Sequence, residues 1–405
     1  MDITGCHVDF PVLSRQIDGQ KISYLDNAAT SLKPRSVIDA MTNYYSQNGS
    51  NIHRGKYYLS EEASHSYERV RYAIAQYLGA FGNEIVFTKN TTEALNLVAY
   101  GLDLKPDDLV IGFLDSHHAQ ILPWRRFANL ELVELDGEGG IDLDHYHDLL
   151  RLKPKVVVLT HCSNVTGTVA PIEHMARAAK EACDAIVVVD AAQSIPHPHL
   201  RIDVSKLDVD FLAFSGHKMM GPTGVGCLYG KSSMLDQLRP LMVGGGMVDW
   251  VDQQGSQQRK IPHRFEAGTP PIASTLGLGE ALSYLLGFSK EDSLEHSNAL
   301  TESIIKGALE RDYLQLLGTK ESADRCAIGS LSIRGCDNLS DIARALSDSY
   351  GIMCRTGHMC AQPVVDNQMN GEVLRISAYI YNTTSEIDEF YKALDELVSF
   401  FGIQS

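Results

Sequence analysis

The stretch that decides the fold is residues 155–190, which read KVVVLTHCSNVTGTVAPIEHMARAAKEACDAIVVVD. Lys155–Thr160 and Ala185–Asp190 are short, β-branched and almost entirely apolar, as expected for strands that are covered on both faces. Glu173–Cys183 between them has the composition of a helix. A strand, a helix and a second strand in this order predict two parallel strands joined by a helical crossover.

The same alternation extends through the first two thirds of the chain. Four further runs are expected to be strands: Glu84–Thr88, Leu109–Leu114, Asp210–Phe214 and Val225–Tyr229. Helices are expected at Thr92–Leu102 and around an apolar stripe spaced by three and four residues: Tyr67, Val70, Ile74, Tyr77 and Leu78. These patterns predict an α/β layer around a mainly parallel sheet.

The last third of the chain has a different character. Residues 243–271 are rich in Gly, Gln and Pro and are expected to form a loop, followed by a helix at Ser274–Leu286. Strands are then expected at Ser330–Arg334 and Val373–Ser377, with a final helix that begins at a capping box of Thr383 and Glu386. We therefore predict a large domain at 20–285 and a small α+β domain at 286–405, with residues 1–19 packing on the small domain.

Composition and charge exclude several classes of protein. Of the 405 residues 44% are hydrophobic and 21% are charged, which is typical of a folded globular chain and not of a disordered one. The net charge of −16 argues against binding to nucleic acid or to an anionic membrane. We expect no transmembrane helix and no secretory signal, because no apolar run is long enough and the first residues lack a basic region.

The cysteines and histidines indicate a reduced, cytoplasmic enzyme without a metal site. The eight Cys are scattered and contain no Cys-x-x-Cys pair, which excludes a disulfide scaffold. The histidine pairs at 117–118 and at 197 and 199 have no further ligands at the usual spacing for a metal. A dinucleotide fold is also disfavoured, since no Gly-x-Gly-x-x-Gly follows a strand.

Polar side chains follow five of the predicted strands. They are Asn90–Glu93, Asp115–His118, His161–Asn164, Asp190 with Gln193, and Ser215–Lys218. Ligands of open α/β sheets bind outside the carboxyl ends of the strands. Because these segments share that edge in the predicted sheet, we expect one polar pocket there.

Part of this pocket suits a phosphate group. Thr91 and Thr92 open a predicted helix and offer hydroxyls, backbone N–H groups and the positive end of the helix dipole. Ser215 and His217 could donate further hydrogen bonds. Taken alone, the two threonines are better explained as helix caps.

The remaining groups suit an aldehyde on a pyridine ring. Lys218 at the end of an apolar strand is an amine that can form a Schiff base. Asp190 could hold a proton on a pyridine nitrogen, although it could also be a helix cap or a salt-bridge partner. Phosphate, pyridine nitrogen and aldehyde together predict pyridoxal 5′-phosphate (PLP), on which His117 could stack and move protons.

A resemblance to a known family runs from Phe10 almost to the C-terminus and is carried by seven motifs. They are YLDNAAT at 24–30, NIHRG at 51–55, TTEA at 91–94, DAAQS at 190–194, SGHK at 215–218, RFEAGTP at 264–270 and RTGHMCA at 355–361. On these residues the chain resembles the group II (SufS/CsdA-type) cysteine desulfurases of the class V aminotransferase group, which are fold-type I PLP enzymes. The resemblance implies a large domain with a mainly parallel seven-stranded sheet and a small C-terminal α+β domain.

The resemblance also implies roles for individual residues. The catalytic residues would be Lys218 as the Schiff-base lysine, Cys360 as the persulfide-forming thiol and His117 as the ring-stacking acid and base. The cofactor ligands would be Thr91, Thr92, His117, Asn164, Asp190, Gln193, Ser215, His217, Lys218 and Thr269. The substrate ligands would be Asn164, Arg355, His358 and Arg375, and a guanidinium fork such as that of Arg375 is itself suited to gripping a carboxylate.

The partners implied are L-cysteine, a second copy of the chain and a sulfur acceptor. Thr269 matches a phosphate ligand that is supplied by the other subunit, so a homodimer with a shared active site is expected. The resemblance further implies a role in iron–sulfur cluster assembly.

Three positions depart from the family pattern and leave alternatives open. Ser116 stands in place of an acid, Met359 in place of a second histidine, and Pro271 in place of an asparagine. The substrate could therefore be selenocysteine or a cysteine conjugate, cleaved by a C–Se or C–S lyase of a specialised pathway. A scaffold that binds a sulfur-transfer partner without turnover is a third hypothesis, against which the intact Lys218 argues.

Overall fold

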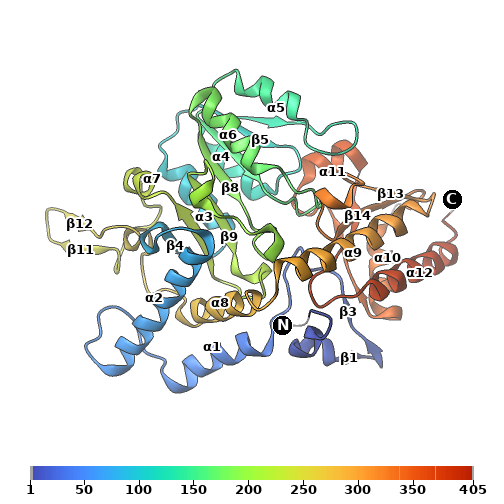
Figure 1. Cartoon of the computed structure of the whole chain (residues 1–405), viewed down its shortest axis with the longest axis horizontal. Helices are drawn as coiled ribbons and strands as arrows, with labels where there is room; N and C mark the ends of the chain where they lie inside the picture. Colours follow the sequence, from blue (N-terminus) through green and yellow to red (C-terminus); the bar gives the residue numbers. More distant parts are fainter. Residues whose placement is uncertain (1–2, 337, 370, 404–405) are drawn as a thin grey trace.

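The computed structural model describes residues 3–336, 338–369 and 371–403 (Figure 1). Its central element is a seven-stranded sheet of strand order β4-β10-β9-β8-β7-β5-β6. The strands are β4 Ile85–Thr88, β5 Leu109–Phe113, β6 Asn129–Val133, β7 Val156–Thr160, β8 Ile186–Asp190, β9 Phe211–Ser215 and β10 Gly226–Gly230. Strand β10 is antiparallel to both of its neighbours, whereas the pairings from β9 to β6 are all parallel. The predicted mainly parallel sheet is confirmed.

Helices cover both faces of this sheet. Successive side chains along each strand point to opposite faces. Val157 and Leu159 of β7 point into one core, and Val156 and Val158 point into the other. The first core contains side chains of α1 Arg35–Gln47, α2 Tyr58–Leu78, α5 Leu143–Leu150, α6 Ile172–Cys183 and α8 Ile272–Leu285. The second contains side chains of α3 Thr91–Gly101, α4 Leu122–Phe127 and α7 Ser232–Gln237.

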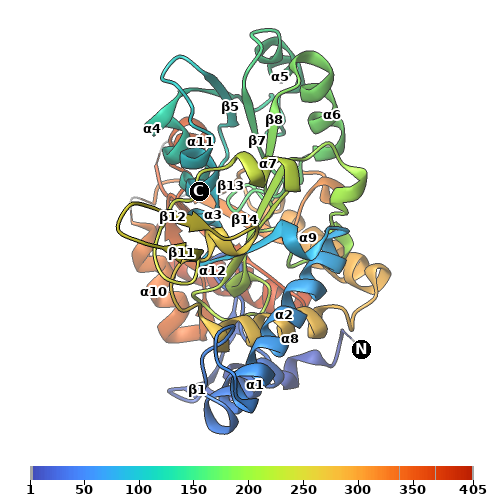
Figure 2. The same ribbon diagram turned by 90° about the vertical axis from the view of Figure 1, so that its left-hand side faces the viewer.

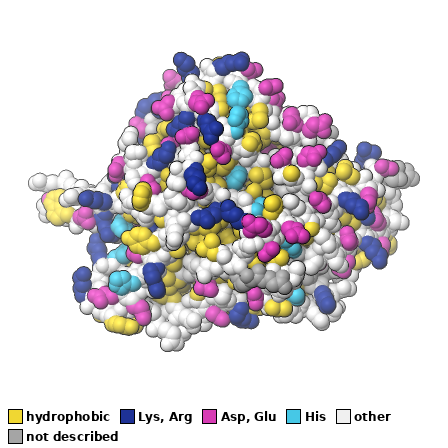
Figure 3. Space-filling view, in the orientation of Figure 1, with side chains coloured by type: hydrophobic (Ala, Val, Ile, Leu, Met, Phe, Trp, Pro, Cys, Tyr) yellow, Lys and Arg dark blue, Asp and Glu magenta, His cyan; other side chains and the backbone are white. Residues whose placement is uncertain are grey.

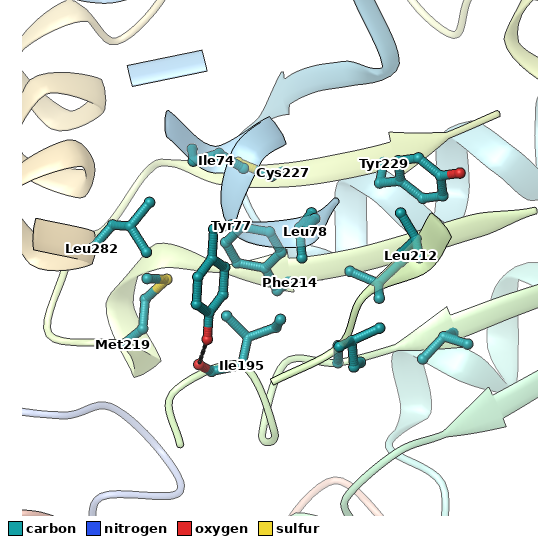
Figure 4. Close-up of a cluster of buried hydrophobic side chains, with 14 of the residues drawn as sticks. Ile74, Tyr77, Leu78, Ile195, Leu212, Phe214, Met219, Cys227, Tyr229 and Leu282 are labelled. Carbon is teal, nitrogen blue, oxygen red and sulfur yellow. Dashed lines mark hydrogen bonds between the residues drawn. The ribbon is translucent and has the colours of Figure 1, made fainter. Parts of the chain in front are cut away.

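The apolar stripe predicted on α2 is the face by which this helix packs on the sheet. Figure 4 shows Ile74, Tyr77 and Leu78 beside Phe214 of β9 and Cys227 of β10. The Tyr77 hydroxyl donates a hydrogen bond to the carbonyl oxygen of Ile195 at 3.5 Å. The spacing of three and four residues therefore identified the buried face correctly.

The C-terminal part has a second sheet and a core of its own. The sheet has the order β13-β14-β17-β16, with β13 Leu314–Leu316, β14 Ile328–Ile333, β16 Arg355–Gly357 and β17 Val373–Ser377. The helices are α9 Lys290–Leu309, α10 Leu339–Tyr350, α11 Gln362–Met369 and α12 Thr384–Phe400. The capping box is confirmed, since Thr383 and Glu386 satisfy each other's backbone N–H groups. Because α8 packs in the large core and α9 in the small one, we propose the domain division at 285/286.

The N-terminal segment bridges the two parts. Phe10 packs against the rings of Tyr284 and Tyr381, with centroids 5.9 and 4.4 Å away. A short hairpin, β1 Gln16–Ile17 with β2 Gln20–Lys21, follows. Strand β3 Ser23–Tyr24 then pairs in parallel with β15 Ile352–Met353 of the C-terminal part. We propose that this segment fixes the small domain against the large one.

Strand β6 and the segment 243–271 of the large part differ from the sequence-based expectation. Strand β6 was not predicted, because it lies at the edge of the sheet and carries exposed Asn129 and Glu131 in place of an apolar run. The expected loop at 243–271 contains an antiparallel hairpin of β11 Val248–Val251 and β12 Ser256–Gln258. This hairpin projects from the body of the protein (Figures 1 and 2), and its residues are mostly exposed. Because neither strand packs on a hydrophobic core, the sequence lacks the alternation of apolar and polar residues that marks a strand.

The surface around the hairpin is partly apolar. Trp250 and Val251 of β11 are exposed, and Figure 3 shows hydrophobic side chains on the projection at the left of the molecule. No helix in the described part of the chain combines the length and apolar character needed to cross a bilayer.

Candidate active site

A cavity lies at the carboxyl ends of β7, β8 and β9, between the large sheet and the C-terminal part. It brings together most of the predicted site residues: Thr91, Thr92, His117, Asn164, Asp190, Gln193, Ser215, His217, Lys218, Arg355, Cys360 and Arg375. The parallel strands of the large sheet bring the residues up to Lys218 to one edge, as expected for an open α/β sheet, whereas Arg355, Cys360 and Arg375 come from the C-terminal part. The predicted single polar pocket is therefore present.

Lys218 enters the cavity from a single turn of 3-10 helix, Gly216–Lys218, that directly follows β9. Its Nζ donates a hydrogen bond to Oε1 of Gln193 at 3.2 Å. Burial lowers the pKa of Lys218 to about 8, against the opposing effect of the Asp190 carboxylate. The amine is therefore much closer to its neutral, nucleophilic form than a surface lysine is.

A second, half-buried lysine holds the turn that carries Lys218. Lys33 Nζ donates hydrogen bonds to Thr30 Oγ1 at 3.1 Å and to the His217 carbonyl oxygen at 3.2 Å. Thr30 and Ser31 donate their hydroxyl protons to the same carbonyl at 3.0 and 3.1 Å. Lys33 was not predicted as a site residue, although it lies just after the YLDNAAT motif. Lys33 and His217 are 184 residues apart in the chain, so no local sequence pattern indicates their contact.

Asp190 ends β8 and is buried beside the cavity. Its Oδ1 accepts a hydrogen bond from the Ala192 backbone N–H at 2.8 Å. Burial raises the pKa of Asp190, while this backbone hydrogen bond and the charge of Lys218 act in the opposite direction. A buried carboxylate of this kind is stabilised by a nearby cationic N–H, which the protonated nitrogen of a pyridine ring would provide.

His117 is held in one tautomer. Its Nδ1 accepts a hydrogen bond from the Ala119 backbone N–H at 3.0 Å, so the proton of the neutral ring lies on Nε2. Burial, with the charge of Lys218 as a second cause, lowers the pKa of His117 to about 4. The neighbouring Ser116, where an acid was expected from the family pattern, is buried and its Oγ hydrogen-bonds Thr160 Oγ1 at 2.9 Å.

The N-terminus of α3 forms the end of the cavity that suits an anion. Asn90 caps the helix by accepting from the Glu93 N–H at 3.0 Å. The Thr91 N–H donates to Ser215 Oγ at 2.9 Å, and the Thr91 and Ser215 hydroxyls are 2.7 Å apart. Burial lowers the pKa of His217 to about 4, so its ring adds neutral donor capacity at this end. Helix dipole, hydroxyls and imidazole together suit a phosphate.

Arg375 of β17 lies on the opposite side and is only 2% exposed. Its Nη1 donates to the Asn164 carbonyl oxygen and its Nη2 to Asp26 Oδ1, both at 2.9 Å. Its Nε is buried and has no hydrogen-bond partner among the described residues. Asp26 was not predicted as a site residue, although it lies in the YLDNAAT motif. The ion pair joins positions 349 residues apart in the chain.

Cys360 stands on a turn of unusual backbone conformation. Met359 and Cys360 both have positive φ, at 52° and 56°, a region that costs a non-glycine residue about 1–2 kcal/mol. Two loops of the large sheet hold the turn: Asn164 Nδ2 donates to the Met359 carbonyl oxygen at 2.8 Å, and the His118 N–H donates to the Cys360 carbonyl oxygen at 2.7 Å. Cys360 is exposed and lines the cavity, so its thiol can meet both a bound substrate and a partner from solvent.

Two predicted residues lie elsewhere. His358 Nε2 is 3.2 Å from Asp366 Oδ1, and His358 is not among the described residues that line the cavity. Thr269 is exposed and lines a separate cavity together with Glu266 and Pro271. The role of Thr269 as a ligand for the cofactor of a partner subunit stays a prediction. The role of His358 as a substrate ligand also stays a prediction.

Comparisons with known proteins agree with this geometry. The model of the Aminotransferase class-V family matches residues 23–390. A "Probable cysteine desulfurase" of Streptomyces coelicolor is 40% identical over 99% of this chain and 98% of its own length. The apo structure of the cysteine desulfurase from Thermococcus onnurineus NA1 is 36% identical with a TM-score of 0.90, covering 98% of both chains. Cysteine desulfurase CsdA from Escherichia coli is 32% identical with a TM-score of 0.88, covering 99% of both chains. The chain therefore belongs to the class V aminotransferases, and within them to the cysteine desulfurases.

Proposed function

We propose that the protein uses PLP to remove the sulfur of L-cysteine, giving L-alanine and a persulfide on Cys360 that passes to an acceptor protein. The observation that carries the proposal is the arrangement of one cavity. The amine of Lys218, the buried carboxylate of Asp190 and the accessible thiol of Cys360 all line it.

The donor set of the cavity fits PLP. Lys218 would hold the aldehyde carbon, Asp190 the protonated ring nitrogen and Gln193 the ring hydroxyl. The phosphate would take the donors that Thr91 and Ser215 now share at the N-terminus of α3. Bound there, PLP would draw electrons away from the Cα of an amino acid, which makes its proton acidic and its β-substituent labile.

The protein's own residues would then position the substrate. The unpartnered Nε of Arg375 is a buried donor suited to one oxygen of the substrate carboxylate. Asp26 and the Asn164 carbonyl already fix the guanidinium plane, so the donor needs no reorientation. The buried cation also favours an α-carboxylate over an uncharged group, which supports an amino acid as substrate.

The protein's residues would also move the protons. Lys218, with its pKa near 8, can accept the Cα proton once substrate has displaced it. His117 can exchange a proton with the substrate through Nε2, because its Nδ1 is occupied. The Cys360 sulfur attacks the substrate sulfur: the new S–S bond forms as the Cβ–S bond breaks, and its electron pair stays with the carbon fragment that becomes alanine.

We further propose a homodimer in the cytoplasm. Thr269 is exposed and near Asn51, whose Nδ2 lies 3.4 Å from its Oγ1, and the exposed hairpin β11–β12 lies in the chain segment before it. An exposed apolar surface of this kind supports an interface with a second copy. The scattered cysteines support a reducing compartment.

The proposal is tested by spectroscopy and product analysis of the purified protein. With added PLP it should turn yellow, and Lys218→Ala should lose the absorption band and the formation of alanine from L-cysteine. Cys360→Ala should keep the band but lose at least a hundredfold in sulfide release, while Cys183→Ala, a half-buried thiol on α6, should match the wild type.

Two outcomes would contradict the proposal. A protein that gains no colour with PLP would exclude the cofactor. Full sulfide release by Cys360→Ala would exclude the persulfide step and favour a C–S lyase.

A further inference from the structure

Two buried thiols lie close together at the cavity, one in its wall and the other behind it. Cys162 follows β7 and lines the cavity with Lys218, and Cys326 precedes β14 in the C-terminal part. They are 3% and 1% exposed and pack in one small cluster with Ala28 and Ile328. The proposed mechanism uses neither thiol.

The backbone brings the two cysteines together at Gly167. The Cys326 N–H donates to the Gly167 carbonyl oxygen at 2.9 Å, and Cys162 Sγ lies 3.6 Å from the same oxygen. Isolated bridges pair Cys162 with Val169 and Thr168 with Arg325, so residues 167–169 form a strip between the two segments. Cys162 through its Sγ and Cys326 through its backbone N–H therefore lie against the same carbonyl group.

We propose that Cys162 and Cys326 form a reversible disulfide when a peroxide enters the cavity. One thiol reduces the peroxide and becomes a sulfenic acid, with release of water. The second thiol then attacks the sulfur of this sulfenic acid, and the S–S bond forms as the hydroxyl group leaves as a second water. In sum, two thiols and hydrogen peroxide give one disulfide and two waters. The inference does not depend on the proposed function, since it needs only the two thiols and an oxidant.

Access and reactivity set the conditions for this reaction. A small peroxide reaches Cys162 through the cavity, whereas Cys326 lies behind it. The contact with Cys326, together with burial, raises the pKa of the Cys162 thiol, and Lys218 acts against this. Since the thiolate is the reactive form, the link should form slowly at neutral pH and faster as pH rises.

The disulfide would act on the turn that carries Cys360. Closing the bond brings the two sulfurs to about 2.05 Å, so the segment after β7 must shift. Asn164, two residues after Cys162, holds the Met359 carbonyl and accepts from Arg375. Oxidation is therefore expected to loosen the Cys360 turn, and it ties the large sheet to the C-terminal part.

The experiment uses the full chain carrying Cys360→Ser, so that oxidation of the exposed thiol does not interfere. The protein is treated with hydrogen peroxide at pH 7 and pH 9, its remaining thiols are alkylated in denaturant, and unreduced peptides are identified by mass spectrometry. We expect a linked peptide pair containing positions 162 and 326, lighter than the two thiol peptides by two hydrogens, about 2 Da. It should form several-fold faster at pH 9, disappear on reduction and be absent in Cys326→Ser.

Controls and contrary results are built into the same digest. Cys227 is buried in β10 and should remain alkylatable throughout. Recovery of both thiols in alkylated form, a sulfinic acid at position 162, or a link from Cys162 to another cysteine would each overturn the proposal. Unchanged hydrogen exchange at residues 355–361 in the linked protein would overturn its effect on the turn.

Discussion

The buried ion pair between Arg71 and Glu266 gives the sharpest prediction about stability. Arg71 of α2 places Nη1 2.6 Å from Oε1 and Nη2 2.9 Å from Oε2 of Glu266, and the two side chains are 2% and 7% exposed. Oε1 also accepts from the Phe87 backbone N–H at 2.8 Å, so Glu266 ties α2 and β4 to the segment that carries Thr269. Replacing Glu266 by Ala removes both contacts at once.

The size of the loss follows from what the substitution leaves behind. A buried charge that loses its partner costs about 3–5 kcal/mol, and a buried N–H without an acceptor costs about 1–3 kcal/mol. Glu68 still pairs with Arg71 through Nε at 2.8 Å and keeps part of the compensation. We therefore expect Glu266→Ala to lower the free energy of unfolding by about 4 kcal/mol.

The assay is denaturant unfolding followed by circular dichroism, with an exposed pair as control. Glu173 and Arg177 on α6 are 2.9 Å apart but 68% and 54% exposed. Glu173→Ala should therefore change stability by less than about 0.5 kcal/mol. A loss below about 1 kcal/mol in Glu266→Ala would refute the view that Glu266 compensates the buried charge of Arg71.

Two further predictions concern pH. Burial lowers the pKa of Lys218 to about 8, so the rate at which PLP-free protein captures PLP should rise through pH 8, as the amine loses its proton. Stopped-flow absorbance measures this rate. A midpoint of the rate profile above pH 10 would contradict the effect of burial on Lys218. Burial, with a smaller effect of His199, lowers the pKa of His197 to about 3 from 6.5, so only the unfolded chain binds this proton between the two values. The stability supplied by His197 is present above pH 6.5 and is lost as pH falls toward 3, at about 1.4 kcal/mol per pH unit. His197→Gln should flatten the pH dependence of unfolding in this window, and an unchanged slope would count against the assignment.

The strands of the large sheet could be predicted because their environment shaped their composition. β7 and β8 are covered on both faces, so both faces select apolar β-branched residues and the runs are visible in the sequence. Strand β6 and the hairpin β11–β12 have no such environment, and their residues are mostly exposed. Sequence patterns report burial more directly than they report backbone pairing.

The cavity could be predicted for a topological reason. Polar residues that directly follow parallel strands are brought to one edge whatever the details of packing, so local motifs sufficed for Asp190 and Lys218. The supports of these groups could not be predicted in the same way. Asp26 meets Arg375, and Lys33 meets the His217 carbonyl, only after the N-terminal segment has packed against both parts of the chain.

The Cys360 turn combines both situations. Its sequence suggests a reactive thiol, yet a glycine would suit the positive φ of positions 359 and 360 better than Met and Cys do. The conformation persists because Asn164 and His118, on two different strand-end loops of the large sheet, bind consecutive carbonyls of the turn. The nucleophile belongs to the C-terminal part, but its backbone is fixed by the part that carries Lys218. The distance between the amine and the thiol is therefore set by the contact between the two parts, and a change at that contact, such as a link between Cys162 and Cys326, would act on the chemistry without touching either group.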